Sequence, residues 1–135
     1  MTTFIKGASA ALCGLAGFLF GSLDGLLLAL IAFMVLDYAT GLVVAWNRKE
    51  LSSAVGFTGI AKKVLILALV AVGHLLDAHI LGGGSVCRNT VIGFYIANEG
   101  ISILENAGNI GIPLPEKLLE VLKQLKAKND KDEEE

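Results

Sequence analysis

The first third of the chain is almost free of charge, and this feature restricts the fold more than any other. Before Asn47 the only charged side chains are those of Lys6, Asp24 and Asp37. Residues 7–23 contain two serines as their only polar residues, and residues 26–45 are apolar apart from a few positions that include Asp37. A helix rises 1.5 Å per residue, so about 20 apolar residues cross a ~30 Å hydrocarbon core. The pattern predicts two membrane-spanning helices joined by a turn at 21–25.

The composition of the whole chain agrees with a membrane protein. Of the 135 residues, 54% are hydrophobic and 18% are charged, and the mean hydropathy is +0.68. A soluble domain has about a quarter of its residues charged. The net charge of −2 comes with basic residues in short clusters between apolar runs, which gives no face for nucleic acid. The predicted fold class is therefore an all-α integral membrane protein.

Two further apolar segments follow a basic stretch. Residues 47–63 carry four basic side chains against one acid, and we expect them to form a cytoplasmic basic loop: Arg48, Lys49, Lys62 and Lys63. The third span centres on 64–76 and reaches full length if Lys62 and Lys63 extend to the surface. After a glycine-rich turn, residues 86–107 form the last span, which Pro113 stops.

Short loops rich in Lys and Arg stay in the cytoplasm, so counting basic residues gives an orientation. Four spans with both ends inside place ten of the eleven basic residues in the cytoplasm and leave Arg88 outside. A three-span version, in which residues 7–23 merge with the next run or lie in the interface, keeps the C-terminus inside. We favour four spans.

The last span carries a polar stripe. Five side chains recur at steps of three or four residues and so fall on one face of a helix: Tyr95, Glu99, Ser102, Asn106 and Asn109. Together with Asp37 in the second span, these groups are costly in lipid, where a central charge costs about 2.5–3.5 kcal/mol. They therefore need other helices, other copies or water, and we predict a pore-lining or oligomer-contact surface.

Small residues and an amphipathic segment complete the pattern. Gly14, Gly17 and Gly21 recur at helical steps and predict close helix packing. The expected organisation is a transmembrane helical domain at 1–112, a cytoplasmic amphipathic helix at 113–128 and a disordered charged tail at 129–135.

No set of residues in the sequence predicts catalysis. There is no nucleophile paired with a base, no metal-ligand cluster and no phosphate loop, so we expect no enzyme activity, no catalytic residue, no metal and no cofactor.

Three ordered motifs carry a family resemblance. They are the strings at 36–41 (LDYATG), 51–63 (LSSAVGFTGIAKK) and 94–106 (FYIANEGISILEN), followed by GIPLP at 111–115. They resemble the phage holin family that includes the clostridial toxin-secretion holins, over roughly residues 26–122. The resemblance implies a small protein of the bacterial cytoplasmic membrane that accumulates and then assembles into lesions, through which an endolysin or a toxin leaves.

The expected partners follow from that resemblance. They are further copies of the chain, membrane lipids and an antiholin, with endolysin or toxin as passing cargo and no nucleic acid. Two alternatives stay open. An antiholin would share the motifs and block assembly, whereas a small ion channel or transporter subunit would use Asp37, His74 and Glu99 as its conduction path.

Overall fold

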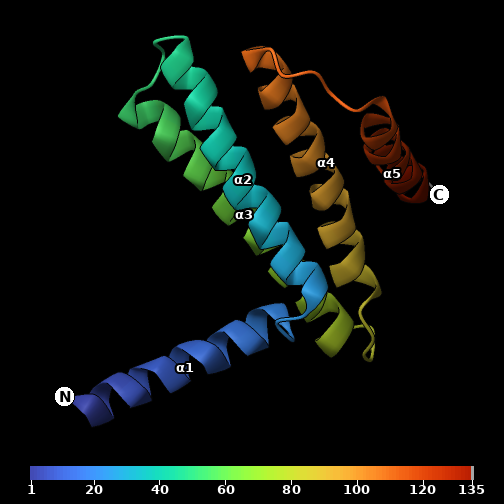
Figure 1. The fold of residues 1–135 in the computed structure, drawn as a ribbon. Coiled ribbons are helices and arrows are strands. Elements are labelled where there is room, and N and C mark those ends of the chain that lie inside the picture. Colours follow the sequence, from blue (N-terminus) through green and yellow to red (C-terminus); the bar gives the residue numbers. More distant parts are fainter. Residues whose placement is uncertain (135) are drawn as a thin grey trace.

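The computed structural model describes residues 1–134, and within this range the chain is helical without any strand (Figure 1). The prediction of an all-α membrane protein is confirmed. The described helices are α1 (Thr2–Phe20), α2 (Gly25–Asn47), α3 (Ser53–His79), α4 (Val86–Ile110) and α5 (Glu116–Glu134).

Local sequence signals set several helix ends. Asp24 precedes α2 and its carboxylate accepts a hydrogen bond from the backbone N–H of Leu27 at 3.0 Å. Ser52 caps α3 in the same way, through Val55 at 3.2 Å. Such caps satisfy backbone donors that the first helical turn leaves free. At the other end of α4, Gly111 adopts a left-handed conformation with φ 98°, which favours glycine and ends the helix.

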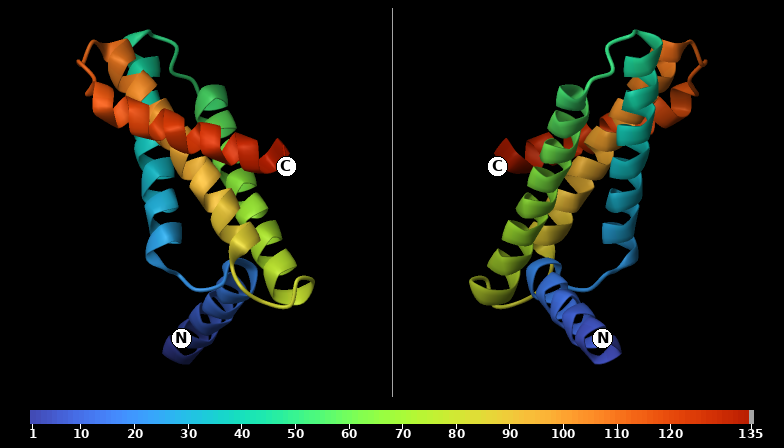
Figure 2. Two further views of the ribbon diagram at one scale, coloured as in Figure 1. Left: turned by 90° about the vertical axis from the view of Figure 1, so that its right-hand side faces the viewer. Right: turned by 90° about the vertical axis from the view of Figure 1, so that its left-hand side faces the viewer.

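Helices α2, α3 and α4 form a bundle in which α3 and α4 each run antiparallel to the helix before them (Figures 1 and 2). Its apolar core lies toward the end of the bundle at which α2 begins: Leu27, Leu30, Met34, Ile66, Val70 and Ile92. Leu30, Val70 and Ile92, one from each helix, are fully buried. In lipid, helices associate through close packing and hydrogen bonds more than through the hydrophobic effect. The buried layer of Leu30, Val70 and Ile92 provides this close packing between the three helices.

Helix α1 points away from the bundle and none of its residues is buried (Figure 1). It touches the bundle near its C-terminal end, where the rings of Phe18 and His79 lie with centroids 5.5 Å apart. Within 1–134, three helices are long and apolar enough to cross a membrane, namely α1, α2 and α3. Helix α4 has 25 residues but carries Arg88, Glu99 and Glu105, so the fourth span stays a prediction.

Helix α5 lies across α4, which it meets through an apolar side (Figure 2). Its backbone runs from Glu116 to Glu134, beyond the helix expected at 113–128 and into the segment 129–135 expected as a tail. Residue 135 lies outside the described residues. The division of the chain into a transmembrane domain, a cytoplasmic helix and a tail stays a prediction.

Candidate functional site

A cluster of polar side chains lies between α2, α3 and α4, beyond the apolar core. We call it the Lys63 cluster, and its members are Asp37 and Thr40 from α2, Lys63 from α3, and Glu99, Ser102 and Asn106 from α4. Asp37 and Thr40 are three residues apart on α2, and the α4 members also follow helical steps, so each helix turns one polar face inward.

Lys63 is the basic member of the cluster, and it bridges two carboxylates. Its Nζ lies 2.5 Å from Oδ2 of Asp37 and 2.6 Å from Oε2 of Glu99. Hydrogen bonds between charged partners are shorter and stronger than neutral ones. Since Asp37, Lys63 and Glu99 come from three different helices, the two ion pairs join all three members of the bundle.

Asp37 also binds α4 directly. Its Oδ1 accepts a hydrogen bond from the Ser102 hydroxyl at 2.5 Å and another from the Asn106 amide at 3.2 Å. The same amide donates to the Thr40 hydroxyl at 2.9 Å, and this hydroxyl donates to the backbone carbonyl of Leu36 at 2.8 Å. Every oxygen of the Asp37 carboxylate therefore has a partner inside the chain.

The cluster is only partly hidden and carries unequal charge. The side chains of Lys63, Asp37 and Glu99 are 19%, 13% and 7% exposed. With both carboxylates and the ammonium charged, the sum is one negative charge. A cavity of about 230 Å³ lies beside them and is lined by Asp37, Gly59 and Lys62 among others. In the part of the chain that the structure describes, no three His, Cys, Asp or Glu side chains form a metal site.

A second cluster ties the opposite end of the bundle together; we call it the Arg88 cluster. Arg88 is 3% exposed and its guanidinium donates to both carboxylate oxygens of Asp24, at 2.9 and 3.2 Å. It also donates to the backbone carbonyls of Phe20 at 2.7 Å and Ser22 at 2.8 Å. These bonds hold the turn between α1 and α2 against the start of α4.

Asp77 completes the Arg88 cluster from α3. Its carboxylate accepts hydrogen bonds from the backbone N–H groups of Cys87 at 3.0 Å and Arg88 at 2.9 Å, and so caps α4 from a neighbouring helix. Asp24 lies outside the helices, and its hydrogen bond with Arg88, followed by that with the Leu27 backbone, lowers the pKa of Asp24 below its ordinary value. Asp24 therefore favours its charged form through fixed donors.

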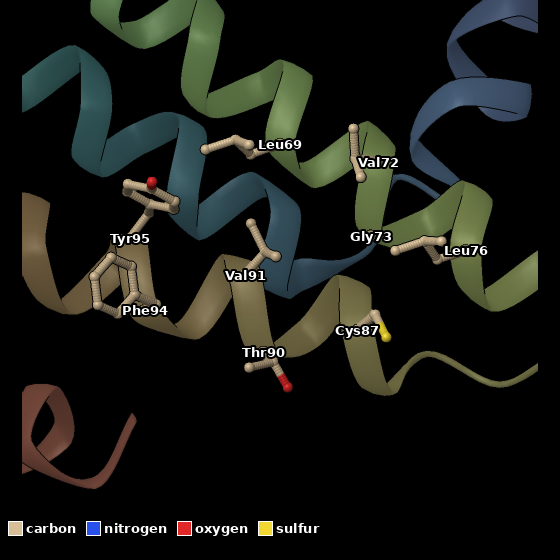
Figure 3. A pocket seen from close by; sticks show the side chains of 9 residues that line it. All are labelled: Leu69, Val72, Gly73, Leu76, Cys87, Thr90, Val91, Phe94 and Tyr95. Carbon is tan, nitrogen blue, oxygen red and sulfur yellow. The ribbon is translucent and has the colours of Figure 1, made fainter. Parts of the chain in front are cut away.

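The structure unites part of the predicted polar stripe and separates the rest. Glu99, Ser102 and Asn106 lie together in the Lys63 cluster with Asp37. Asn109 is exposed one turn further along α4. Tyr95 lies outside the Lys63 cluster and, together with Phe94, lines an apolar groove of about 280 Å³ between α3 and α4 (Figure 3).

The predicted packing glycines lie in different surroundings. Within the described residues, no atom would lie within 4 Å of a Cβ at Gly14 or Gly17, so these positions pack against nothing in this chain. Gly21 has φ 76°, and a Cβ there would lie 2.9 Å from the His74 ring. Of the three positions, only Gly21 has a close contact with a neighbouring element within the described chain.

The predicted basic loop was wrong for two of its four members. Arg48 and Lys49 lie in the turn after α2, but Lys62 and Lys63 lie within α3, which begins at Ser53. The signal for this was the Ser52 cap, because a helix that begins there carries Lys63 roughly 15 Å along its axis. No local signal of this kind predicts the contact of Arg88 with the α1–α2 turn, because it joins residues 64 positions apart.

The fold and its two clusters define the class: a small all-α membrane protein with charged groups paired between its helices. The chain belongs to the bacteriophage holin family, whose family model matches residues 14–127.

Relatives of this chain occur in bacteria and in a phage. An uncharacterized protein of Listeria monocytogenes is 48% identical over 118 residues, covering 87% of this chain and 84% of that protein. An uncharacterized 14.9 kDa protein in the nagH 3′ region of Clostridium perfringens is 44% identical over 125 residues, 93% and 95% of the two chains. A probable holin of Bacillus phage phi105 is 36% identical over 113 residues, 84% and 82% of the two chains. No solved structure matches the chain.

Proposed function

We propose that this protein is a holin that oligomerises in the bacterial cytoplasmic membrane and forms lesions through which an endolysin or a toxin leaves the cell. Membership of the holin family and the likeness to a probable phage holin support this function. The structural observation that carries it is the Lys63 cluster, because three helices share polar groups that can be satisfied within one chain or by water.

The proposed topology has four spans with both ends in the cytoplasm. Helix α4 crosses the membrane as the least apolar span, and it can do so because Glu99, Ser102 and Asn106 face α2 and α3 instead of lipid. Arg88 and Asp24 lie at the outer surface, and the turn with Arg48 and Lys49 lies inside, in keeping with the excess of basic residues in cytoplasmic loops.

In the proposed mechanism the polar face of α4 changes partners. Within a single chain Asp37 and Lys63 occupy that face, which lets the protein accumulate without a leak. As copies assemble, α4 moves away from α2, and Glu99, Ser102, Asn106 and Asn109 come to line water or the polar side of the contact between copies. Each hydrogen bond lost within the chain is replaced by one to water, so the net free-energy change of this exchange is small.

Expression in bacteria tests the function directly. With an endolysin present, we expect an abrupt fall in culture density after a fixed delay, together with entry of a membrane-impermeant dye. Graded ion leakage without lysis would instead support a small channel or transporter subunit. A delay in the lysis caused by another holin would support an antiholin.

Cysteine accessibility tests the proposed lining. In a Cys13→Ala, Cys87→Ala background, we expect Ser102→Cys and Asn106→Cys to react with a water-soluble maleimide at least tenfold faster after triggering than before. Ile96→Cys and Ile103→Cys are the matched controls on the same helix and should change little. Equal labelling of all four positions after triggering would rule out the lining role.

A further inference from the structure

Helix α5 packs along α4 and approaches it most closely at a glycine. Leu122 is 8% exposed, and a Cβ at Gly100 would lie 3.0 Å from its Cδ2 atom. The Phe33 ring of α2 borders the same position at 3.4 Å. The segment that connects α4 to α5 makes a second contact, because a Cβ at Gly108 would lie 3.5 Å from Cδ1 of Leu114. The absence of a side chain at Gly100 is therefore what lets Leu122 reach the α4 backbone.

Only part of the apolar side of α5 takes part in this contact. Leu118, Val121 and Leu125 are 47%, 47% and 43% exposed. They flank Leu122 at helical steps of one, three and four residues, so they form an apolar strip beside it that the contact with α4 leaves partly exposed. An amphipathic helix with such a strip is typical of segments that lie in the membrane interface.

The docked position conflicts with a bilayer around α4. Gly100 lies ten residues before the end of α4 at Ile110, which is roughly 15 Å along the helix and near the centre of a ~30 Å hydrocarbon core. A docked α5 would hold Lys117, Glu120 and Lys123 beside this depth, and all three are exposed. Charged side chains cost most at the bilayer centre. Among the described residues of α5 only Leu122 is buried, so the docked contact offsets little of that cost.

The connection between the two helices allows α5 to move as a unit. Gly111 has φ 98° and ends α4 with hydrogen bonds from its own N–H and that of Ile112 to carbonyls of the last turn. The residues from Ile112 to Pro115 form no helix, and the two prolines cannot continue one. A change in the direction of α5 therefore breaks no helical hydrogen bond of α4.

We propose that α5 leaves α4 when α4 spans the bilayer, lies on the cytoplasmic lipid surface, and uncovers the Gly100 face of α4 for α4 of a second copy. On the lipid surface, Leu122 and the strip of Leu118, Val121 and Leu125 all reach the acyl chains. The vacated face at Gly100 permits the close approach of another helix, as Leu122 demonstrates within the chain. This inference rests on the proposed holin function for its assembly step, but the movement of α5 can be measured without it.

A disulfide pair measures the movement. In the Cys13→Ala, Cys87→Ala background, the pair Gly100→Cys with Leu122→Cys joins α4 to α5, and the cysteine at 122 removes the Cδ atoms that a Cβ at 100 would meet. We expect efficient intramolecular crosslinking in detergent micelles and a yield at least fivefold lower in phosphatidylglycerol-containing vesicles. The pair Gly100→Cys with Gln124→Cys is the control, because Gln124 is exposed and lies two residues after Leu122, on the opposite side of α5. An equal yield in micelles and vesicles for the 100–122 pair would overturn the inference.

Single cysteines test the second copy. In vesicles we expect Gly100→Cys to form at least fivefold more intermolecular dimer than Thr90→Cys, which is exposed on a different face of α4. Equal dimer yields at positions 100 and 90 would overturn this part. The two proposals fail separately: loss of lysis in the parent protein would contradict the holin function alone, whereas an α5 that stays crosslinked to α4 in vesicles would contradict only this inference.

Discussion

Lys63 is surrounded by more negative charge than it can neutralise. It pairs with Asp37 and Glu99 at 2.5 and 2.6 Å, and the three side chains are each less than one-fifth exposed. Removing one partner of a buried ion pair is much more costly than replacing the whole pair, because the remaining charge keeps its desolvation cost without compensation. Without Lys63, two carboxylates would face each other with only neutral donors beside them.

The substitution Lys63→Ala should therefore destabilise the bundle by about 3–5 kcal/mol. Lys62→Ala is the matched control. Lys62 is the neighbour of Lys63 in the chain and is exposed, so this substitution should change the free energy of unfolding by no more than about 0.5 kcal/mol. Reversible unfolding of the purified protein in detergent measures both. Similar losses for the two variants would contradict the central position of Lys63.

Asp24 gives a pH dependence whose sign can be derived. The hydrogen bond from Arg88 holds the pKa of Asp24 in the folded protein below its ordinary value of 3.8. Between those two values the unfolded chain binds more protons, so stability rises with pH. The contribution is complete above pH 3.8 and is lost as the pH falls through the folded pKa.

We expect the difference in Tm between the parent protein and Asp24→Asn to stay constant from pH 7 to about pH 4.5 and to shrink at lower pH. Asparagine keeps the capping oxygen for Leu27, so the comparison isolates the carboxylate charge. Thermal unfolding in detergent at a series of pH values measures it. A difference that grows as the pH falls would contradict the assigned sign.

At the scale of the helices, the sequence predicted the elements better than their contacts. Apolar runs and turn residues located four helices, since length and hydropathy act locally. The stripe on α4 was also visible, because helical periodicity places Glu99, Ser102 and Asn106 on one face. Its partner was not predictable in the same way. Whether Lys63 meets Glu99 depends on how two antiparallel helices are aligned, and no local pattern fixes that alignment.

The approach of α3 to α4 depends on one glycine. A Cβ at Gly73 would lie 3.0 Å from the Cα and backbone N of Arg88 and 3.1 Å from the carbonyl carbon of Cys87. Backbone atoms cannot rotate away as a flexible side chain does, so even a methyl group would push the start of α4 outward. The same displacement would strain the bonds from Asp77 to the α4 N-terminus.

Gly73→Ala should therefore destabilise the protein by about 1–3 kcal/mol, the usual cost of overpacking. Gly93→Ala is the control: within the described residues no atom would lie within 4 Å of its Cβ, and alanine in a helix is favoured over glycine by up to about 1 kcal/mol. Unfolding in detergent should thus give changes of opposite sign. A neutral Gly73→Ala would show that α3 and α4 can move apart without cost.

On the scale of the whole molecule, the bundle is fastened differently at its two ends. The Arg88 cluster joins turns and helix ends through hydrogen bonds to backbone carbonyls and N–H groups. These backbone groups are fixed in place, so new side-chain partners cannot take over the same bonds. The Lys63 cluster consists mainly of side-chain pairs, which can be exchanged for water or for another copy. If the bundle opens during assembly, we expect α4 to separate from α2 at the Lys63 cluster while the Arg88 cluster holds as a hinge.

Lysis timing tests this order of opening. Asp37→Asn removes the ion pair with Lys63 and leaves a neutral cluster, so α4 should separate from α2 more readily and lysis should begin at least twofold earlier at equal protein levels. Ser102→Ala removes one hydrogen bond to Asp37 without a change of charge, and a smaller advance is expected.

The charge also has an effect of its own, since one elementary charge moved through the membrane field is worth about 2.3 kcal/mol per 100 mV. An advance from Asp37→Asn alone would assign timing to the charge rather than to the contact between helices. Unchanged timing for both variants would remove the Lys63 cluster from the opening step.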